Sequence, residues 1–182
     1  MTQLFRALRP VLLFLLLLPA PLMAQEDGPQ DYEALLAALA GAESQAEADG
    51  LVPRIWNHWL TAPDPTAQEV LDAALERRRS YDFLGALGHL NLLVAKYPDY
   101  AEGWNQRATV YFAIGDFDAS LADVAEVLAR EPRHFGALSG RAMIYYRQGR
   151  LPLAQLAVRK ALEVHPFLAE RAILDIPAGD DI

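Results

Sequence analysis

Apolar residues recur at helical spacing along most of the chain from residue 31 onward. Two such stripes follow each other in the segment 101–134: Trp104, Ala108 and Tyr111, then Phe117, Leu121, Val124 and Leu128. Spacings of three and four residues place the side chains of each stripe on one face of an amphipathic helix. Gly115 and Asp116 separate the stripes, and glycine commonly ends a helix while aspartate commonly begins one. The segment therefore predicts two helices joined by a tight turn.

This pattern repeats every 34 residues. Pro98, Pro132 and Pro166 follow one another at that interval, and cutting the chain just beyond each proline gives the blocks 67–100, 101–134 and 135–168. Residues at the same position of each block form a column. Two columns contain only small residues: Ala74, Ala108 and Ala142 form one, and Ala86, Ser120 and Ala154 form the other. Small columns let two helices approach closely, and the proline ends the second helix of each pair. We expect three stacked helix pairs, because repeats of this length form stacked arrays.

The chain on either side of the blocks is also expected to be helical. Residues 31–61 within the segment 25–66 have an amphipathic pattern without a clear 34-residue match, and Pro53 is expected to kink or divide the second of two helices there. Because the ends of a stacked array need atypical units, we interpret 25–66 as an irregular N-terminal cap. Residues 169–182 predict a short capping helix followed by an acidic tail.

The blocks resemble tetratricopeptide repeats, whose pattern is W-x2-L-G-x2-Y, then A-x3-F, then P. The second block supplies Trp104, Tyr111 and Pro132, and the third supplies Leu138, Ala142, Tyr145, Gly149, Ala154 and Pro166. The first block is degenerate, because Arg77 stands where the pattern has tyrosine. Gly85 and Gly88 also weaken its second helix, by about 1 kcal/mol each.

This resemblance implies an all-α fold: a solenoid of antiparallel helix pairs wound into a right-handed superhelix, with the irregular N-terminal cap in front. The segment from Pro98 to Gly140 is more narrowly similar to a group of exported alphaproteobacterial tetratricopeptide proteins. That narrower resemblance covers roughly residues 50–170 and implies no particular activity.

Residues 1–24 have the pattern of a signal peptide. Arg6 and Arg9 precede an apolar run, and Leu22-Met23-Ala24 provides a small-residue cleavage signal. The apolar run is short and is broken by prolines, whereas a membrane span needs about 20 apolar residues. We therefore expect export to the periplasm of a bacterium, and a membrane contact only if the segment stays uncleaved as an anchor.

Charge and cysteine content narrow the classes of partner. The chain has 16 basic and 24 acidic side chains, and export would remove two of the arginines. This acidic balance argues against nucleic acid, whose binding depends on clustered lysine and arginine. The sequence contains no cysteine, which excludes disulfides, thiolate catalysis and cysteine-ligated zinc.

The stretch 129–141, AREPRHFGALSGR, has the composition of a phosphate loop or an acid/base site. The repeat places His134 in a turn, in one column with Tyr100 and Leu168, neither of which could share an acid/base role. We therefore expect His134 to pack at the turn, with anion binding beside Arg133 as the alternative. No histidine pair has metal-ligand spacing and no serine has a nucleophile-elbow context, so we expect no catalytic residue, metal or cofactor.

Binding is the function that the resemblance implies, because the first helices of stacked pairs line a concave groove. The side chains expected to point into it are Arg78, Arg79, Asn105, Thr109, Phe112, Ser139, Met143, Tyr146 and Arg147, together with Leu71 and Leu75. Such a mixture suits an extended peptide or an amphipathic helix. The arginines could also recognise a carboxylate. Phe112 and Tyr146 could instead pack between neighbouring helices.

The sequence thus predicts a non-catalytic interaction module of the bacterial cell envelope that binds a protein or peptide partner. Two alternatives stay open. The first is a small-ligand or enzyme site, either in the concavity of the array or between the cap and the first block, near Trp56, His58 and Trp59. The second is a structural subunit that joins an envelope complex through the two tryptophans and an edge of the array.

Overall fold

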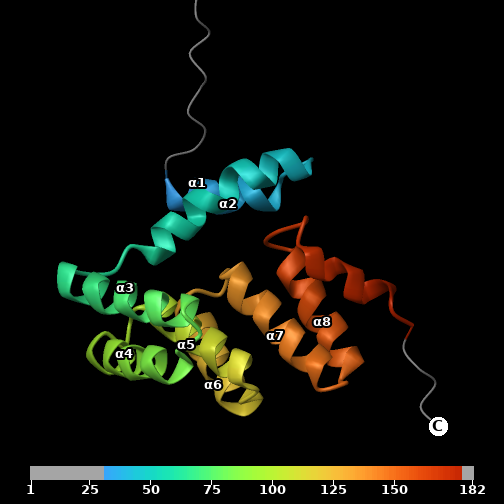
Figure 1. Ribbon diagram of the computed structural model, residues 1–182. Helices are drawn as coiled ribbons and strands as arrows, with labels where there is room; N and C mark the ends of the chain where they lie inside the picture. The colour runs from blue at the N-terminus through green and yellow to red at the C-terminus, as the bar shows by residue number, and fades with distance from the viewer. Residues whose placement is uncertain (1–30, 178–182) are drawn as a thin grey trace, which may run out of the picture.

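Helices make up nearly all of the computed structural model, which describes residues 31–177 (Figure 1). The described helices are α1 (Tyr32–Ala40), α2 (Gln45–Leu60), α3 (Pro65–Arg79), α4 (Phe83–Lys96), α5 (Ala101–Ile114), α6 (Phe117–Arg130), α7 (Phe135–Arg147), α8 (Leu151–Leu162) and the 3-10 helix η1 (Ala169–Asp175). This range contains no strand, so the all-α fold class is confirmed. The predicted signal peptide and the last residues of the acidic tail lie outside the described residues.

Side-chain caps explain where most of these helices begin. Asp64, Asp82 and Asp116 each accept a hydrogen bond from a backbone N–H in the first turn of α3, α4 and α6. Gly115 ends α5 with a φ of 83°, in the left-handed region that glycine adopts without strain. The cap and turn residues of the sequence thus set the helix boundaries locally.

One local expectation needs correction. Helix α2 continues through Pro53, so this proline does not divide it. The C-terminal capping segment is a 3-10 helix, held by Gln155, whose amide donates to the carbonyls of Ile173 and Ile176. Within the described range, no helix is both long and apolar enough to cross a membrane.

The pairs α3–α4, α5–α6 and α7–α8 are antiparallel and stack in chain order, as Figure 1 shows. The small columns of the sequence lie at the helix contacts: Ala74, Ala108 and Ala142 are buried, as are Ala86, Ser120 and Ala154. The hydroxyl of Ser120 donates to the Ala108 carbonyl at 2.8 Å, which satisfies the polar member of these columns. The stacked solenoid is therefore confirmed.

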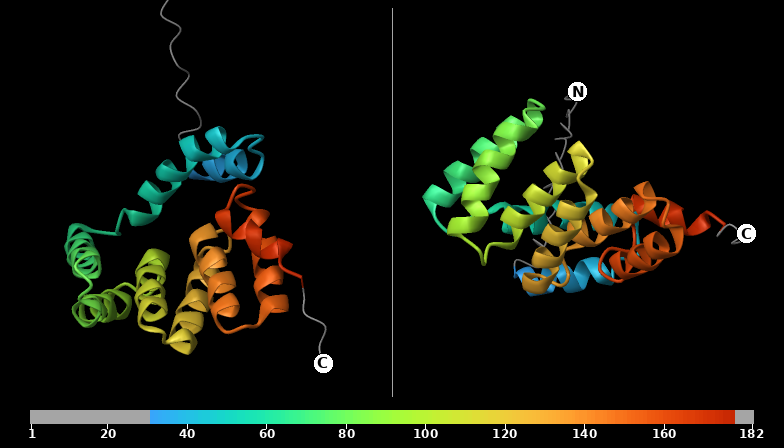
Figure 2. Two further views of the ribbon diagram at one scale, coloured as in Figure 1. Left: turned by 45° about the vertical axis from the view of Figure 1, so that its right-hand side comes forward. Right: turned by 90° about the horizontal axis from the view of Figure 1, so that it is seen from below.

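The N-terminal pair α1–α2 lies in an unexpected place. It does not stack on the first helix pair but folds across to the third, so that the chain forms a curved frame (Figure 2, left). Leu36, Ile55 and Trp59 of this pair share one core cluster with Phe135 and Leu138 of α7. Burial of these large apolar side chains drives the docking. We call α1–α2 the docked hairpin.

Candidate functional site

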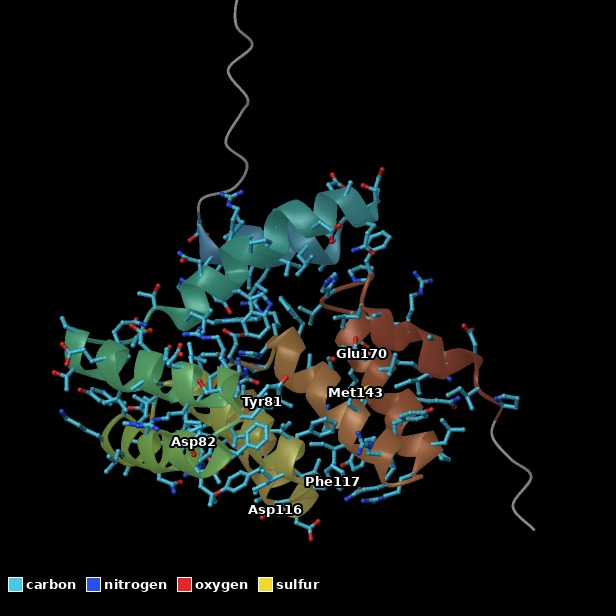
Figure 3. All side chains as sticks on the ribbon, in the orientation of Figure 1. Tyr81, Asp82, Asp116, Phe117, Met143 and Glu170 are labelled. Carbon is cyan, nitrogen blue, oxygen red and sulfur yellow. The ribbon has the colours of Figure 1, made fainter. Side chains whose placement is uncertain are left out.

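A cavity of about 200 Å³ lies between α5 and α7. Asn105, Thr109 and Phe112 line it from α5, and Ser139 and Met143 line it from α7. Asn105 and Ser139 occupy one column of the repeat, as do Thr109 and Met143, so equivalent faces of two first helices meet here. Glu170 of η1 also lines the cavity, and Figure 3 shows it beside Met143. We call this cavity the groove.

Five of the nine expected groove residues therefore line one cavity. Of the other four, Tyr146 is exposed, and the guanidinium of Arg147 lies 5.8 Å from the ring centroid of Phe112 at one end of the groove. Arg79 is exposed and pairs with Glu76 at 2.7 Å. Arg78 is half-buried, and its Nη1 donates to Oε1 of Gln106 at 2.6 Å.

The expectation for Leu71 is wrong, because this side chain is fully buried in the core of the first block. Leu75 is partly buried against the same core cluster. At these two positions the first block therefore contributes to the core and does not line the groove.

A buried polar network, which the sequence reasoning missed, lies beneath the groove. Glu102 is only 1% exposed, and its carboxylate accepts hydrogen bonds from the side chains of Asn105, Gln106 and His134. Burial lowers the pKa of Arg78, and the carboxylate of Glu102 opposes this shift. No periodic signal could have identified Glu102, because its column contains Gln68 and Gly136 and so has no constant chemistry.

His134 belongs to this network as a structural residue. Its Nδ1 accepts the backbone N–H of Ala137 at 3.1 Å and so caps α7. The ring proton must then be on Nε2, which donates to Oε2 of Glu102 at 2.9 Å. Trp59 stacks on the imidazole at a centroid distance of 3.8 Å. His134 thus has the turn and packing role that the repeat register predicts.

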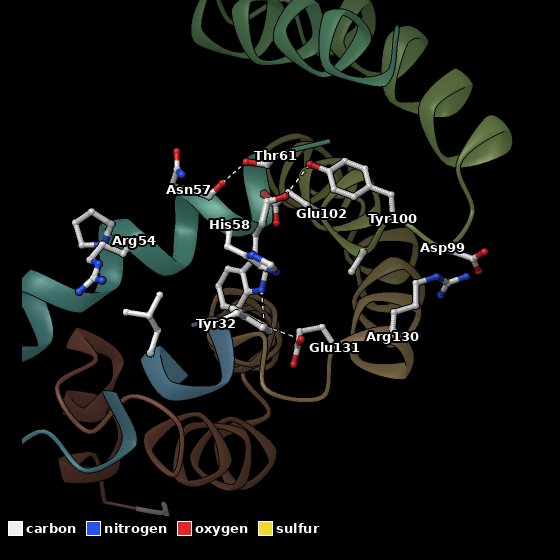
Figure 4. Close-up of a pocket in the computed structure, with 14 residues that line it drawn as sticks. Tyr32, Arg54, Asn57, His58, Thr61, Asp99, Tyr100, Glu102, Arg130 and Glu131 are labelled. Atoms are coloured by element: carbon white, nitrogen blue, oxygen red, sulfur yellow. Dashed lines mark hydrogen bonds between the residues drawn. The ribbon is translucent and has the colours of Figure 1, made fainter. Parts of the chain in front are cut away.

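A larger cleft of about 730 Å³ lies between the docked hairpin and the turns of the array (Figure 4). Tyr32, His58 and Trp59 line it from the hairpin, opposite Tyr100 and Glu131. Two of the three residues of the sequence alternative, His58 and Trp59, therefore line a cleft, whereas Trp56 does not. The opposite wall comes from the end of the first block, with Asp99 and Tyr100, and from the second block, with Glu102, Arg130 and Glu131.

Several polar groups of this cleft hold the hairpin. The phenol of Tyr32 donates to Glu131 at 2.6 Å and accepts the indole N–H of Trp59 at 2.8 Å. The phenol of Tyr100 donates to the Trp59 carbonyl at 2.7 Å. Burial is the main cause that raises the pKa of both tyrosines, so they remain protonated donors. In the described range, no group of three or more His, Asp or Glu side chains could hold a metal ion.

Trp56 lies where the docked hairpin packs against α7, a contact that we call the seam. Gly136 of α7 lies opposite its ring. A Cβ placed on Gly136 would lie 2.7 Å from Cη2 of Trp56, closer than such atoms approach. Trp56 and Trp59 also contact each other and Phe135 as aromatic pairs. Both tryptophans are therefore used inside the protein, which argues against the alternative in which they join a larger complex.

Burial of His165 at this seam predicts that the stability of the protein depends on pH. The ring contacts Phe135 at a centroid distance of 5.3 Å, and burial lowers its pKa, with Asp49 and Glu170 opposing the shift. The unfolded chain takes up this proton near its ordinary pKa of about 6.5, whereas the folded chain does so only at lower pH. The unfolded state therefore binds more protons below about pH 6.5, and the free energy of unfolding falls as the pH is lowered there.

Urea unfolding at a series of pH values would measure this dependence. We expect the His165→Gln variant to show a flatter profile just below pH 6.5, above the range in which the carboxylates titrate. Equal slopes for the variant and the original chain would contradict this assignment.

Comparisons with known proteins agree with the helical repeats. A sequence profile of the tetratricopeptide repeat family matches residues 105–169. A TPR repeat-containing protein of the alphaproteobacterium Rhizobium etli is 40% identical over 111 residues, which are 61% of this chain and 53% of that protein. The chain thus spans about half the length of this curated relative.

Two solved structures have a similar arrangement of helices. The TPR domain of P58(IPK) aligns with a TM-score of 0.53 at 15% identity, over 79% of this chain and 40% of that one. The TPR2AB domain of yeast Sti1, in a complex with pHSP90, aligns with a TM-score of 0.56 at 17% identity, over 79% and 59% respectively. At these identities the similarity shows the fold, which is a stack of antiparallel helix pairs.

Proposed function

Because the chain is a tetratricopeptide repeat protein, we propose that it is a non-catalytic interaction module that binds a peptide or helix of a partner protein in its groove. The observation that carries this proposal is the groove itself, where equivalent faces of α5 and α7 meet around one cavity. Proteins with this repeat typically mediate protein–protein interactions.

The lining of the groove suits a segment with both apolar and polar groups. Phe112 and Met143 offer apolar surface, while Asn105, Thr109 and Ser139 add amide and hydroxyl groups. The neighbouring helices already hold these side chains in place, so a ligand does not have to order the site when it binds. Arg147 at one end adds a positive charge for an acidic residue of the ligand.

The compartment that we propose for this function is the bacterial periplasm. The signal-peptide pattern of residues 1–24 supports export, and the absence of cysteine is compatible with an oxidising compartment. If the signal segment stays uncleaved, it would attach the module to the membrane instead.

The cleft beside His58 supports a second candidate, which is a site for a small ligand. Its volume is within the range of small-molecule pockets. The hydrogen bonds of Tyr32, Tyr100 and Glu131 hold the hairpin, so fewer groups are left to orient a ligand there. We therefore place the groove first.

Substitution of Thr109 by tyrosine is expected to block the groove. Thr109 is exposed and lines the cavity, so an added phenol ring would occupy the ligand space without entering the core. Peptides selected from a displayed library on the original protein should lose affinity at least about tenfold, which is about 1.4 kcal/mol. Fluorescence polarisation measures the change.

The control is Ala125→Tyr, which adds the same ring to an exposed position of α6. It should leave peptide affinity unchanged. If selected peptides bind the Thr109 variant as tightly as the original protein, the groove is not their site. Their affinity for a His58→Ala variant would then test whether they bind in the cleft.

A further inference from the structure

Helix α4, the second helix of the first block (Figure 1), exposes several apolar side chains to solvent. Tyr81 and Leu84 are each 81% exposed, and Leu92 is 65% exposed. Leu84, Gly88 and Leu92 lie four positions apart and therefore share one side of the helix. Asn91 and Ala95 are also exposed on this side, and Asn91 accepts a hydrogen bond from Arg107 of α5. The side ends at the exposed Lys96, four positions after Leu92, and its residues from Leu84 to Ala95 are uncharged. We call it the α4 face.

The other helix pairs provide an internal comparison for this face. The positions of Leu84 and Leu92 correspond to Asp118 and Glu126 in α6, 34 residues later. In α8 they correspond to Pro152 and Lys160. These columns face solvent in all three second helices, and only α4 fills both with leucine. The repeat fold therefore does not require apolar residues there.

Tyr81, just before α4 begins, also differs from the residues at its position in the other two repeats. Its column contains Gly115 and Gly149, which adopt φ values of 83° and 72°, and Tyr81 adopts a φ of 60°. A residue with a side chain costs roughly 1–2 kcal/mol in this left-handed conformation. Within the chain its ring has an edge contact with Phe83 but is otherwise largely exposed. The ring is therefore accessible to another molecule.

Gly88 lies at the centre of the face without a packing reason inside the chain. A Cβ at this position would meet no atom within 4 Å, so alanine would fit. Glycine in a helix interior is about 1 kcal/mol less favourable than alanine. The glycine leaves a depression between Leu84 and Leu92 into which a leucine of another helix could pack.

We propose that the α4 face binds the α4 face of a second copy of this chain, with the two helices antiparallel. The chain has a net charge of −8, so two copies approach with least repulsion through an uncharged face. Asp82, which caps α4 and also pairs with Arg77 at 3.0 Å, lies at one end of α4, and Lys96 lies at the other. The Asp82 side chain is 40% exposed, so a second cation can still approach it. An antiparallel pair centred near Gly88 therefore brings Lys96 of each copy towards Asp82 of the other, and the face complements itself.

The size of the face predicts a weak association. Three large side chains on one helix bury less than the roughly 1,200 Å² of total surface at which stable interfaces begin. We therefore expect a dimer that forms and dissociates with concentration. This inference does not depend on the proposed groove function, because α4 contributes no residue to the groove cavity.

Sedimentation velocity of the full chain over a wide concentration range tests the association. The double variant Leu84→Asp and Leu92→Glu introduces the residues that α6 carries at these columns, so the repeat fold should tolerate it. We expect concentration-dependent dimers for the original chain and at least tenfold weaker association for the variant, with unchanged circular dichroism. A monomeric original chain, or equal association of both proteins, would overturn the proposal.

A cysteine placed at the centre of the face tests the geometry independently. Because the chain has no cysteine, Gly88→Cys creates a unique thiol, and mild oxidation should link two copies through it. The control is Ala122→Cys, the same column of α6, which is also exposed. Cross-linking of the first variant alone supports the antiparallel pair. Equal cross-linking of both variants, or of neither, would refute it and favour a different occupant of the face.

Discussion

Substitution of Trp59 by alanine is expected to lower the free energy of unfolding by about 3–5 kcal/mol, the usual loss for a buried aromatic residue. Trp59 is 6% exposed and stacks on the ring of His134. Its indole N–H donates to Tyr32, and its ring contacts Phe135. The substitution leaves a cavity at the seam of the docked hairpin and removes this hydrogen bond, so its effect should exceed that of the other single substitutions described above.

Urea unfolding followed by circular dichroism measures this loss. The control is Tyr146→Ala, another aromatic truncation, at a position that is 43% exposed on the array. That change should stay within about 0.5 kcal/mol, as is usual for surface positions. A loss below about 1 kcal/mol for the Trp59 variant would show that the hairpin contributes little to stability, contrary to its burial.

Replacement of Glu102 by alanine is the second large effect, and we expect a loss of about 3–5 kcal/mol. The buried side chains of His134, Asn105 and Gln106 would each lose their acceptor. Arg78 would also lose the carboxylate that offsets its burial. Uncompensated polar groups in the interior cost more than the same groups in water.

Two variants separate the charge of Glu102 from its hydrogen bonds. Glu102→Gln keeps one acceptor oxygen and should destabilise less than alanine. Glu126→Ala removes a partly exposed acid that pairs with Arg130 across one helical turn, and it should cost no more than about 0.5 kcal/mol. If the Glu102 and Glu126 alanine variants were equally stable, the buried network would not be a major source of stability.

Local sequence chemistry predicted the repeated part of this fold because each decision there depends on near neighbours. The 34-residue columns place small residues where helices touch, and Asp116 and Gly115 mark a helix start and stop that the structure reproduces. The same register explains why five expected groove residues line one cavity, since Asn105 and Ser139 occupy equivalent positions. Whether that cavity binds a partner stays a prediction.

The sequence could not predict how the first block would use its side chains. Leu71 occupies the same repeat position as the groove residue Asn105, yet the packing of α3 against α4 buries its side chain. Arg78 was expected to face the groove, but it lies beside Gln106. This contact depends on the relative shift of α3 and α5 along their axes. Periodicity identifies a helical face but does not measure such shifts.

The sequence by itself determined the helices, their pairing and their order along the chain, because capping and apolar periodicity act within a few residues. Only the tertiary structure decided that the docked hairpin crosses to the third block, and that Glu102 at the start of α5 meets His134 at the start of α7. These contacts join residues far apart in the chain. Trp56 packs over Gly136 and Trp59 stacks on His134, and such contacts depend on where the folded array places residues that are distant in the sequence.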